Sequence, residues 1–314
     1  MADESSTEEL VKRIKKTITK IKKEMPSLAT ILSTYGKIFS EKVRLREELP
    51  FIMDVPVSPP DPLRFSHGMT LLNEGIFPLS TDSMEKVRDR MIPVLSRAFP
   101  KIRPVLRKLK AALKKNQLDL KTCMESMLHN RDEIISQTAS RLETDPFTLK
   151  FILGQLLKPL IERQAENLRS LIENLGWQKG YCPVCGSFPV LSYLKGDEGQ
   201  RWLICGLCGH EWRFMRTQCP FCENEDPKKS ELCFVEDRAY ERAEMCHQCK
   251  RYLTGIDLRK YPYEFIPEVA LTGMMYLDVL AQGKGFLPMA DSAWTLVPHL
   301  DISSKKPKSK AGNS

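Results

Sequence analysis

Apolar residues recur at the spacing of one helix face through the first half of the chain. A second helix can begin at a Ser83 cap, and two shorter stripes cover residues 118–128 and 134–142. These patterns predict a series of amphipathic helices that bury their apolar faces against one another. The first stripe consists of Val11, Ile14, Ile18, Ile21 and Met25.

The longest helical stripe begins at Asp145 and Pro146, an N-cap residue followed by a proline suited to the first helical position. Its apolar positions continue to residue 175, and Gly176 supplies a C-terminal stop. We expect the residues upstream of this glycine to form a helical domain with a core that does not depend on sulfur. A proline-rich run near residues 55–62 predicts a linker within that domain.

Beyond Gly176 the pattern changes to short β-prone segments that alternate with turns and pairs of cysteines. Residues 188–194 and 201–204 are β-prone, and the glycines between them predict a hairpin. The sequence predicts a structural duplication, because the same order recurs downstream. The second copy has a cysteine pair at Cys219, β-prone residues 232–235, a return strand into Cys246 and a last strand at 252–256.

The predicted fold class is α+β, with an N-terminal helical domain followed by two tandem four-cysteine modules of the zinc-ribbon type. The last residues are rich in lysine and small polar side chains, a composition that buries little apolar surface. The expected boundaries are 1–176 for the helical domain, 177–217 and 218–263 for the two modules, 264–302 for a C-terminal helical segment and 303–314 for a disordered basic tail.

Four C-x-x-C pairs lie within the second half. A two-residue spacer lets a tight turn, or knuckle, aim both sulfurs at one ion, and two knuckles joined by a hairpin complete a four-sulfur shell. Consecutive pairing leaves 19 residues between Cys185 and Cys205 and 23 between Cys222 and Cys246, close to zinc-ribbon spacing, with interleaved pairing as the alternative. The candidate metal ligands are Cys182, Cys185, Cys205, Cys208, Cys219, Cys222, Cys246 and Cys249.

Four thiolates suit two kinds of mononuclear ion. The same tetrahedral shell holds structural zinc or a single redox-active iron, so the ligands predict two metal ions per chain without choosing between iron and zinc. Four sulfurs leave no open position for an activated water, and the sequence has no phosphate-binding glycine loop, so the pattern does not predict an enzyme. A thiol-redox role for C-P-F-C at Cys219 or C-H-Q-C at Cys246 is the catalytic alternative.

The other cysteines and two histidines receive structural interpretations. Cys123 shares a helix face with apolar residues and Cys233 lies within a predicted strand, so both are expected to be buried. His210 and His247 flank knuckle cysteines. Surface or supporting positions are favoured for them over metal ligation, because eight thiols are already available.

Composition and charge limit the compartment and the partners. The 314 residues include 28% charged side chains and ten cysteines, with a net charge of +8, and the N-terminal region has no apolar run typical of a signal peptide or a membrane span. In a reducing compartment, clustered thiols favour metal ligation over disulfides. We therefore expect a cytoplasmic protein.

Two basic features could contact a partner. Seven basic and no acidic side chains lie between Val11 and Lys23, which predicts an amphipathic basic helix whose basic face is most simply an ordinary solvated one. Aromatic and arginine side chains beside the second knuckle suit a protein interface or nucleic-acid stacking. The candidate partner-binding residues are Trp212, Arg213, Phe214 and Arg216.

Four segments of the second half share a recognisable pattern. They are C-P-V-C-G-S-F-P-V from Cys182, C-G-L-C-G-H-E-W from Cys205, A-E-M-C-H-Q-C-K-R-Y-L from Ala243 and Y-L-D-V-L-A-Q-G-K-G-F from Tyr276. Between residues 176 and 288 the chain thereby resembles one known family, the FdhE-type formate dehydrogenase accessory proteins. One departure is I-P-E-V from Ile266, where we expect an acidic doublet.

The resemblance implies a cytoplasmic protein with two rubredoxin-like modules that bind iron or zinc, needed for formate dehydrogenase to become active. We therefore expect an accessory factor that binds the formate dehydrogenase catalytic subunit and uses two closed metal sites to fix its binding surface. The alternative is a nucleic-acid-binding zinc-ribbon protein, favoured by the basic helix and by Arg213 and Arg216. The sequence does not indicate an oligomeric state.

Overall fold

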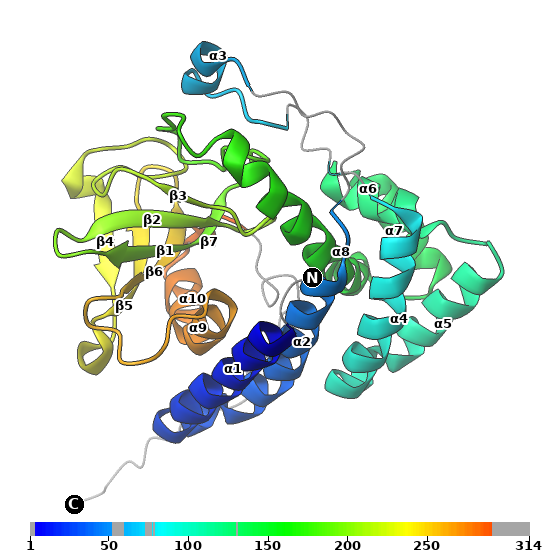
Figure 1. Cartoon of the computed structure of the whole chain (residues 1–314). Coiled ribbons are helices and arrows are strands. Elements are labelled where there is room, and N and C mark those ends of the chain that lie inside the picture. The colour runs from blue at the N-terminus through cyan, green and yellow to red at the C-terminus, as the bar shows by residue number, and fades with distance from the viewer. Residues whose placement is uncertain (1–3, 52–59, 73–76, 78, 130, 291–314) are drawn as a thin grey trace, which may run out of the picture.

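The computed structural model describes residues 4–51, 60–72, 77, 79–129 and 131–290. Most helices of the N-terminal half gather on one side of the molecule and a β-sheet lies on the other, with the long helix α8 (Pro146–Leu168) between them (Figure 1). Most of the predicted linker and the whole predicted basic tail lie outside the described residues. Among the helices that are described, none combines the length and the apolarity that a bilayer span needs.

The helical half begins with a pair of helices that lie side by side, α1 (Glu4–Glu24) and α2 (Ala29–Glu48) (Figure 1). The predicted apolar stripe forms the buried face of α1, where Val11 and Ile18 are at most 7% exposed. Basic residues such as Lys12 are exposed on the opposite side. The basic helix is therefore an ordinary amphipathic helix that packs on its neighbours.

Helix α8 begins where the sequence predicts, because the Asp145 carboxylate accepts a hydrogen bond from the Thr148 backbone N–H at 2.8 Å. The predicted end at Gly176 is wrong. The helix ends at Leu168, where a 3₁₀ turn begins, and the chain then folds back so that the Trp177 indole donates to the Tyr181 carbonyl. The other helices of this half are α3 (Pro62–Ser66), α4 (Thr81–Ala98), α5 (Arg103–Lys114), α6 (Leu120–Leu128) and α7 (Asp132–Arg141).

Two local expectations in the helical half have different outcomes. The cap of α4 is Ser80 and not Ser83: the Ser80 hydroxyl accepts from the Ser83 backbone N–H at 3.5 Å, and Ser83 itself is buried inside the helix. The earlier start places Asp82 in the first turn, where its charge favours the helix dipole. Cys123 on α6 is buried, as predicted.

One continuous sheet contains the strands of both predicted modules, in the order β3-β2-β1-β6-β5-β4. Each module contributes three antiparallel strands, and a parallel pairing between β1 and β6 joins the two modules. The predicted duplication is present. The strands are β1 (Pro189–Lys195), β2 (Gln200–Cys205), β3 (Glu211–Arg213), β4 (Ser230–Cys233), β5 (Glu241–Cys246) and β6 (Arg251–Asp257).

Helices α9 (Pro267–Gly273) and α10 (Met275–Gly283) pack against one face of this sheet. Beyond them, the expectation of helix is wrong, because the chain forms the short strand β7 (Leu287–Pro288), which pairs in parallel with the start of β6. Residues 291–302 of the predicted helical segment lie outside the described part. Cys233, at the end of β4, is half-buried and not fully buried as expected.

The core of the helical half is not independent of sulfur. A single hydrophobic cluster contains buried residues of α1, α2, α4 and α8 together with the cysteines of the first module. Members as distant in sequence as Leu32 and Cys205 are both fully buried in it. The expected separate helical core is therefore wrong, since the sulfurs themselves form part of the surface on which the helices pack.

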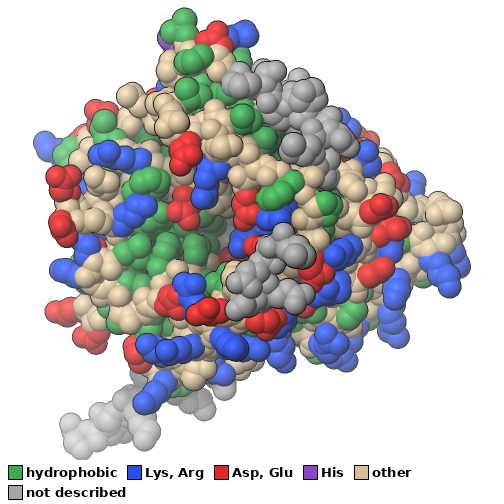
Figure 2. Space-filling model, viewed as in Figure 1, with side chains coloured by type: hydrophobic (Ala, Val, Ile, Leu, Met, Phe, Trp, Pro, Cys, Tyr) green, Lys and Arg blue, Asp and Glu red, His purple; other side chains and the backbone are tan. Residues whose placement is uncertain are grey.

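Charged side chains lie at the junction of the two halves. Lys42 on α2 is 4% exposed, and its Nζ is 3.6 Å from a carboxylate oxygen of Glu268 on α9. On α8, Lys158 pairs with Glu162 at 3.0 Å and also donates to the Gly206 carbonyl at 3.3 Å. Side chains of both signs surround the hollow between the halves (Figure 2). Pairing offsets the cost of burying these charges.

A buried ion pair also ties the two modules together across the sheet. Glu244 on β5 pairs with Arg201 on β2, and its other oxygen accepts from the Ser192 hydroxyl on β1 at 3.0 Å. The carboxylate reaches these partners by crossing β6 at Gly255, where an added Cβ would lie 2.7 Å from both Glu244 Oε1 and Ser192 Oγ. The missing side chain of Gly255 is thus what makes room for this pair.

We predict that Gly255→Ala lowers the free energy of unfolding by about 1–3 kcal/mol, because the new methyl group must displace a paired carboxylate. The cost should shrink by at least about 1 kcal/mol in a Glu244→Ala background, where the obstacle is gone. Denaturant unfolding of the four metal-loaded proteins of this double-mutant cycle measures both quantities. Equal costs in the two backgrounds would contradict the explanation that Gly255 makes room for the Glu244 carboxylate.

Candidate metal centres

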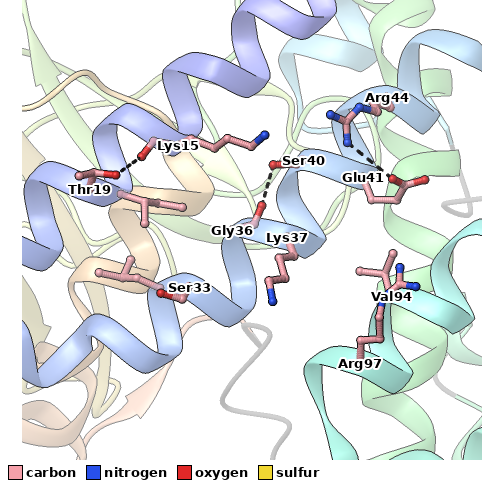
Figure 3. A pocket seen from close by; sticks show the side chains of 12 residues that line it. Lys15, Thr19, Ser33, Gly36, Lys37, Ser40, Glu41, Arg44, Val94 and Arg97 are labelled. Atoms are coloured by element: carbon pink, nitrogen blue, oxygen red, sulfur yellow. Dashed lines mark hydrogen bonds and ion pairs between the residues drawn. The ribbon is translucent and has the colours of Figure 1, made fainter.

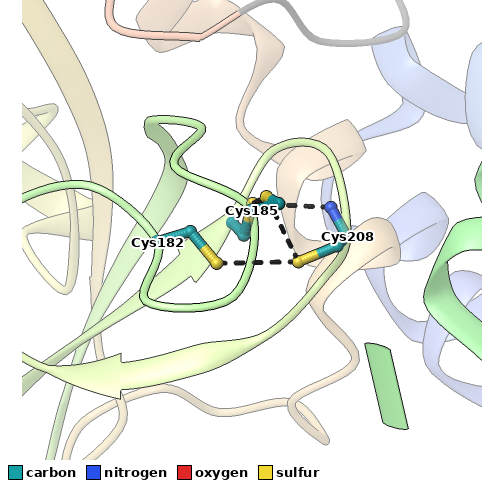
Figure 4. Close-up of side chains that lie close together, drawn as sticks. Cys182, Cys185 and Cys208 are labelled. Atoms are coloured by element: carbon teal, nitrogen blue, oxygen red, sulfur yellow. Dashed lines mark hydrogen bonds between the residues drawn. The ribbon is translucent and has the colours of Figure 1, made fainter. Parts of the chain in front are cut away.

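The structure groups the eight knuckle thiols into two clusters, as consecutive pairing predicts. In each cluster the four sulfurs all lie within 4.8 Å of one another. Figure 4 shows three members of the first cluster with their sulfurs pointing toward a common centre. Site 1 consists of Cys182, Cys185, Cys205 and Cys208, and site 2 consists of Cys219, Cys222, Cys246 and Cys249.

The sulfur spacing fits a tetrahedral metal ion. A metal–sulfur bond of about 2.3 Å implies tetrahedral sulfurs about 3.8 Å apart, whereas a disulfide bond is only about 2.05 Å long. In site 1 the Sγ atoms of Cys182 and Cys208 are 3.6 Å apart, and in site 2 those of Cys219 and Cys249 are 3.9 Å apart. All ten cysteines are free. Both sites could therefore hold a mononuclear ion of the zinc or iron size.

All four knuckles use the same backbone geometry. The residue after the second cysteine donates its N–H to the carbonyl of the first, as in the bond from Gly186 to Cys182 at 2.9 Å. That residue has a positive φ in every knuckle, which glycine adopts without strain. Site 1 has glycine at both positions, but site 2 has Glu223 and Lys250, each with φ of 57°. The left-handed conformation costs a non-glycine residue about 1–2 kcal/mol.

Segments far away in sequence cover site 1. Leu71 and Leu72 donate backbone N–H groups at 2.9 Å to the carbonyls of Pro183 and Val184 inside the first knuckle. On the other side, Lys158 of α8 holds the Gly206 carbonyl of the second knuckle. These residues were not predicted from the sequence. They are tertiary partners on unrelated segments, and nothing in their local pattern indicates the contact.

The pKa shifts of the thiols indicate what four ionised sulfurs in one cluster would need. In site 1, burial raises the pKa of Cys182 and of Cys208, whereas hydrogen bonds from the neighbouring thiols lower the pKa of Cys185. In site 2, burial raises the pKa of Cys219 to about 11. Four thiolates so close together therefore cannot all be ionised near neutral pH unless a metal ion compensates their charge.

Neither flanking histidine belongs to a four-sulfur cluster. His210 is buried beside site 1, and desolvation with the charge of Arg169 lowers its pKa to about 4, so the ring is neutral at neutral pH. Its Nδ1 has no hydrogen-bond partner among the described residues. His247 is exposed, and its Nε2 is 2.9 Å from a Glu231 carboxylate oxygen. These placements agree with supporting and surface positions.

The predicted partner-binding residues divide into two groups. Trp212 and Phe214 are 4% and 5% exposed, so their side chains belong to the core and cannot offer a surface for contact or stacking. Arg213 and Arg216 are exposed beside them. Within β3, alternation explains the difference between Trp212 and Arg213, since successive side chains point to opposite faces, whereas Phe214 and Arg216 lie beyond the end of the strand.

The dithiols of site 2 lack the setting expected of a disulfide oxidoreductase. A catalytic C-x-x-C pair typically lies at a helix N-terminus. Here the first pair is followed by irregular chain up to a 3₁₀ turn at Pro227–Lys229, and the second is followed directly by β6. Each pair also faces the other across a four-sulfur cluster, which favours metal ligation.

A separate cavity of about 420 Å³ lies between α1, α2 and α4 (Figure 3). Lys15, Lys37 and Arg97 contribute positive charge to its rim, while Arg44 is already paired with Glu8. No cysteine lines this cavity. It is therefore unrelated to the two clusters.

The fold and the clusters define a class of protein: a helical half joined to a duplicated, zinc-ribbon-like sheet that carries two four-thiol clusters able to hold metal ions. Residues 181–216, which contain site 1, match the family described as "FdhE, central domain". A curated "Protein FdhE homolog" of Aquifex aeolicus is 32% identical over 162 residues, which are 50% of this chain and 56% of the relative. A homologue of Haemophilus influenzae is 38% identical over 108 residues, or 34% and 35% of the two chains.

The crystal structure of the FdhE protein from Pseudomonas aeruginosa has the same fold, with a TM-score of 0.60 at 19% identity over 90% of this chain and 94% of that one. The chain is therefore similar to FdhE proteins in its cysteine-containing part, where the motifs indicated the resemblance, and it shares their fold. The matched part spans about half the length of the Aquifex aeolicus relative and about a third of the Haemophilus influenzae one.

We predict that Cys185→Ser and Cys205→Ser each remove the same one of two ions, because both thiols face one centre. The double variant should then lose no more metal than either single variant, whereas Cys185→Ser with Cys219→Ser should lose both ions. Elemental analysis of the purified full-length variants provides the counts, with Cys123→Ser as the control that keeps two ions. Loss of only one ion from the Cys185 and Cys219 double variant would instead support interleaved pairing.

We also predict that metal removal loosens α8 near Lys158, because the Gly206 carbonyl that it binds belongs to a knuckle that loses its ion. Hydrogen exchange before and after chelation should show lost protection there and in both sites. Helix α5, which packs on α4, should keep its protection. Unchanged exchange in α8 would show that the two halves are stabilised independently.

Proposed function

We propose that this protein is a cytoplasmic accessory factor that binds the catalytic subunit of formate dehydrogenase and is needed for that enzyme to become active. The observation that carries the proposal is the pair of four-thiol clusters in a chain that is similar to FdhE proteins. The partner is inferred from the family resemblance. The structural role of the metal is inferred from the geometry of the clusters. The proposed cofactors are two mononuclear ions per chain, iron or zinc.

Closed clusters support a structural and not a catalytic use of the metal. Four sulfurs complete a tetrahedral shell, so a resident ion has no position left for substrate or an activated water. An ion bound there would cross-link two knuckles that are distant in sequence. The chain's own residues then keep the sheet and its edge in one conformation, which lowers the entropy lost when a partner binds.

The proposed partner-binding face lies at the sheet edge formed by β3. Arg213 and Arg216 are exposed there, with the 58% exposed side chain of Met215 between them. Trp212 lies behind this face and donates its indole N–H to the Lys179 carbonyl at 3.1 Å, which anchors β3 to the segment before the first knuckle. Arginine and methionine on a rigid support are typical of protein interfaces.

We predict that Arg213→Ala with Arg216→Ala raises the dissociation constant for the formate dehydrogenase catalytic subunit at least tenfold, about 1.4 kcal/mol, while both ions stay bound. Arg107→Ala with Lys110→Ala removes the same charge from exposed positions of α5 and should leave the affinity unchanged. Binding of the purified catalytic subunit to each full-length variant, followed by metal analysis, tests this. Equal affinities would remove this face from the proposal.

A genetic experiment tests the function itself. Deletion of the gene should abolish formate dehydrogenase activity while the enzyme polypeptide remains, and Cys205→Ser or Cys246→Ser should reproduce that loss. Full formate oxidation in the deletion strain would overturn the proposed function. The nucleic-acid alternative would then come first.

A further inference from the structure

The two sites differ in their exposure to solvent. All four cysteines of site 1 are buried, with at most 9% exposure. In site 2, Cys222 and Cys249 are half-buried, although Cys219 and Cys246 are not accessible. An external small molecule therefore meets two half-buried cysteines at site 2, whereas all four cysteines of site 1 are buried.

The residues between the paired cysteines show the same difference. Pro183 and Val184 of the first knuckle are buried under the backbone of residues 71 and 72. In the last knuckle, His247 and Gln248 are both exposed, and so is Lys250 directly after it. Site 1 is thus enclosed by other segments of the chain, whereas one knuckle of site 2 faces water.

Backbone conformation also distinguishes site 2 from site 1, and this observation is independent of exposure to solvent. Both knuckles of site 1 end in glycine, while both knuckles of site 2 place a charged residue, Glu223 or Lys250, in the left-handed region at φ of 57°. A non-glycine residue resists this conformation, so each knuckle of site 2 gains freedom when its sulfurs leave an ion. Site 2 is therefore both more accessible and held under more strain.

We propose that the two sites have different tasks: site 1 keeps a permanent structural ion, and site 2 is an exchange site that gives up or accepts an ion by reaction with an external thiol. This inference rests on the proposed function only in taking both clusters as metal sites. The exchange is a ligand substitution without change of oxidation state. A bond from the ion to an incoming thiolate sulfur forms as the bond to Cys249 Sγ breaks, and the same substitution at the other three cysteine sulfurs releases the ion. Each freed cysteine thiolate takes up the proton that an incoming thiol has lost.

The test uses the full-length protein loaded with zinc and a chromophoric zinc chelator in the presence of glutathione. We expect release in two phases. The first equivalent should leave without denaturant and the second only when the chain unfolds. Alkylation with N-ethylmaleimide, read by peptide mass spectrometry, should modify Cys222 and Cys249 during the first phase. The half-buried Cys233, which belongs to neither site, serves as the reference for thiol access.

A double variant tests whether backbone strain in the knuckles of site 2, and not a general loosening of the chain, speeds the release of the first ion. Glu223→Gly with Lys250→Gly should slow the first phase roughly three- to tenfold and leave the second phase unchanged, because glycine relieves the left-handed positions. Glu225→Gly, an exposed neighbour outside the positive-φ positions, is the matched control and should not slow release.

The outcomes are distinct. Release of both equivalents at one rate, or modification of site 1 cysteines first, overturns the division of tasks while the metal sites stand. A protein that binds fewer than two zinc ions before the experiment starts would instead overturn the metal sites of the proposed function, and with them this inference.

Discussion

The rest of the structure depends on one electrostatic constraint: four clustered thiols can all ionise within a few ångströms of one another only around a cation. Sulfurs 3.5–3.9 Å apart match a tetrahedral shell and are far too distant for disulfides. Each knuckle positions its two sulfurs through a backbone hydrogen bond and a left-handed residue. An ion that joins two knuckles contributes on the order of 10–16 kcal/mol in small zinc domains.

The effect of that shell extends through the sheet to the helices. The cysteine pairs lie at strand ends, so fixing the knuckles fixes the register of β2 and of β5. The Arg201–Glu244 pair then holds the modules together, and Arg201 also donates to the Gln218 carbonyl, next to the first cysteine of site 2, at 2.8 Å. Lys158 links the second knuckle of site 1 to α8. An ion bound at site 1 would therefore be coupled to the packing of the helical half.

Local sequence signals predicted much of the fold and of the two cysteine clusters. The Asp145–Pro146 start, the buried stripe of α1 and the consecutive grouping of cysteines depend on neighbours within a few residues or on a fixed spacing, and the structure confirms them. Features that depend on distant partners were predicted wrongly or not at all. Burial of Trp212, the early end of α8 and the covering of site 1 by residues 71 and 72 follow from tertiary packing.

The contrast between the sites shows what sequence can and cannot indicate. Glycine after the second cysteine of each site 1 knuckle is visible in the sequence, and so are glutamate and lysine at the same positions of site 2. Their meaning appears only when φ and burial are known. Likewise I-P-E-V at 266–269 departs from the expected acids, yet its Glu268 lies beside the buried Lys42, a partner more than two hundred residues away.

X-ray absorption at the metal edge of the full-length protein tests the central claim most directly, because it reports the ligands of every bound ion at once. The account predicts a single shell of four sulfur ligands at about 2.3 Å for both ions, with no nitrogen or oxygen ligand. A substantial nitrogen or oxygen contribution, or fewer than four sulfurs per ion, would contradict two closed four-thiolate sites.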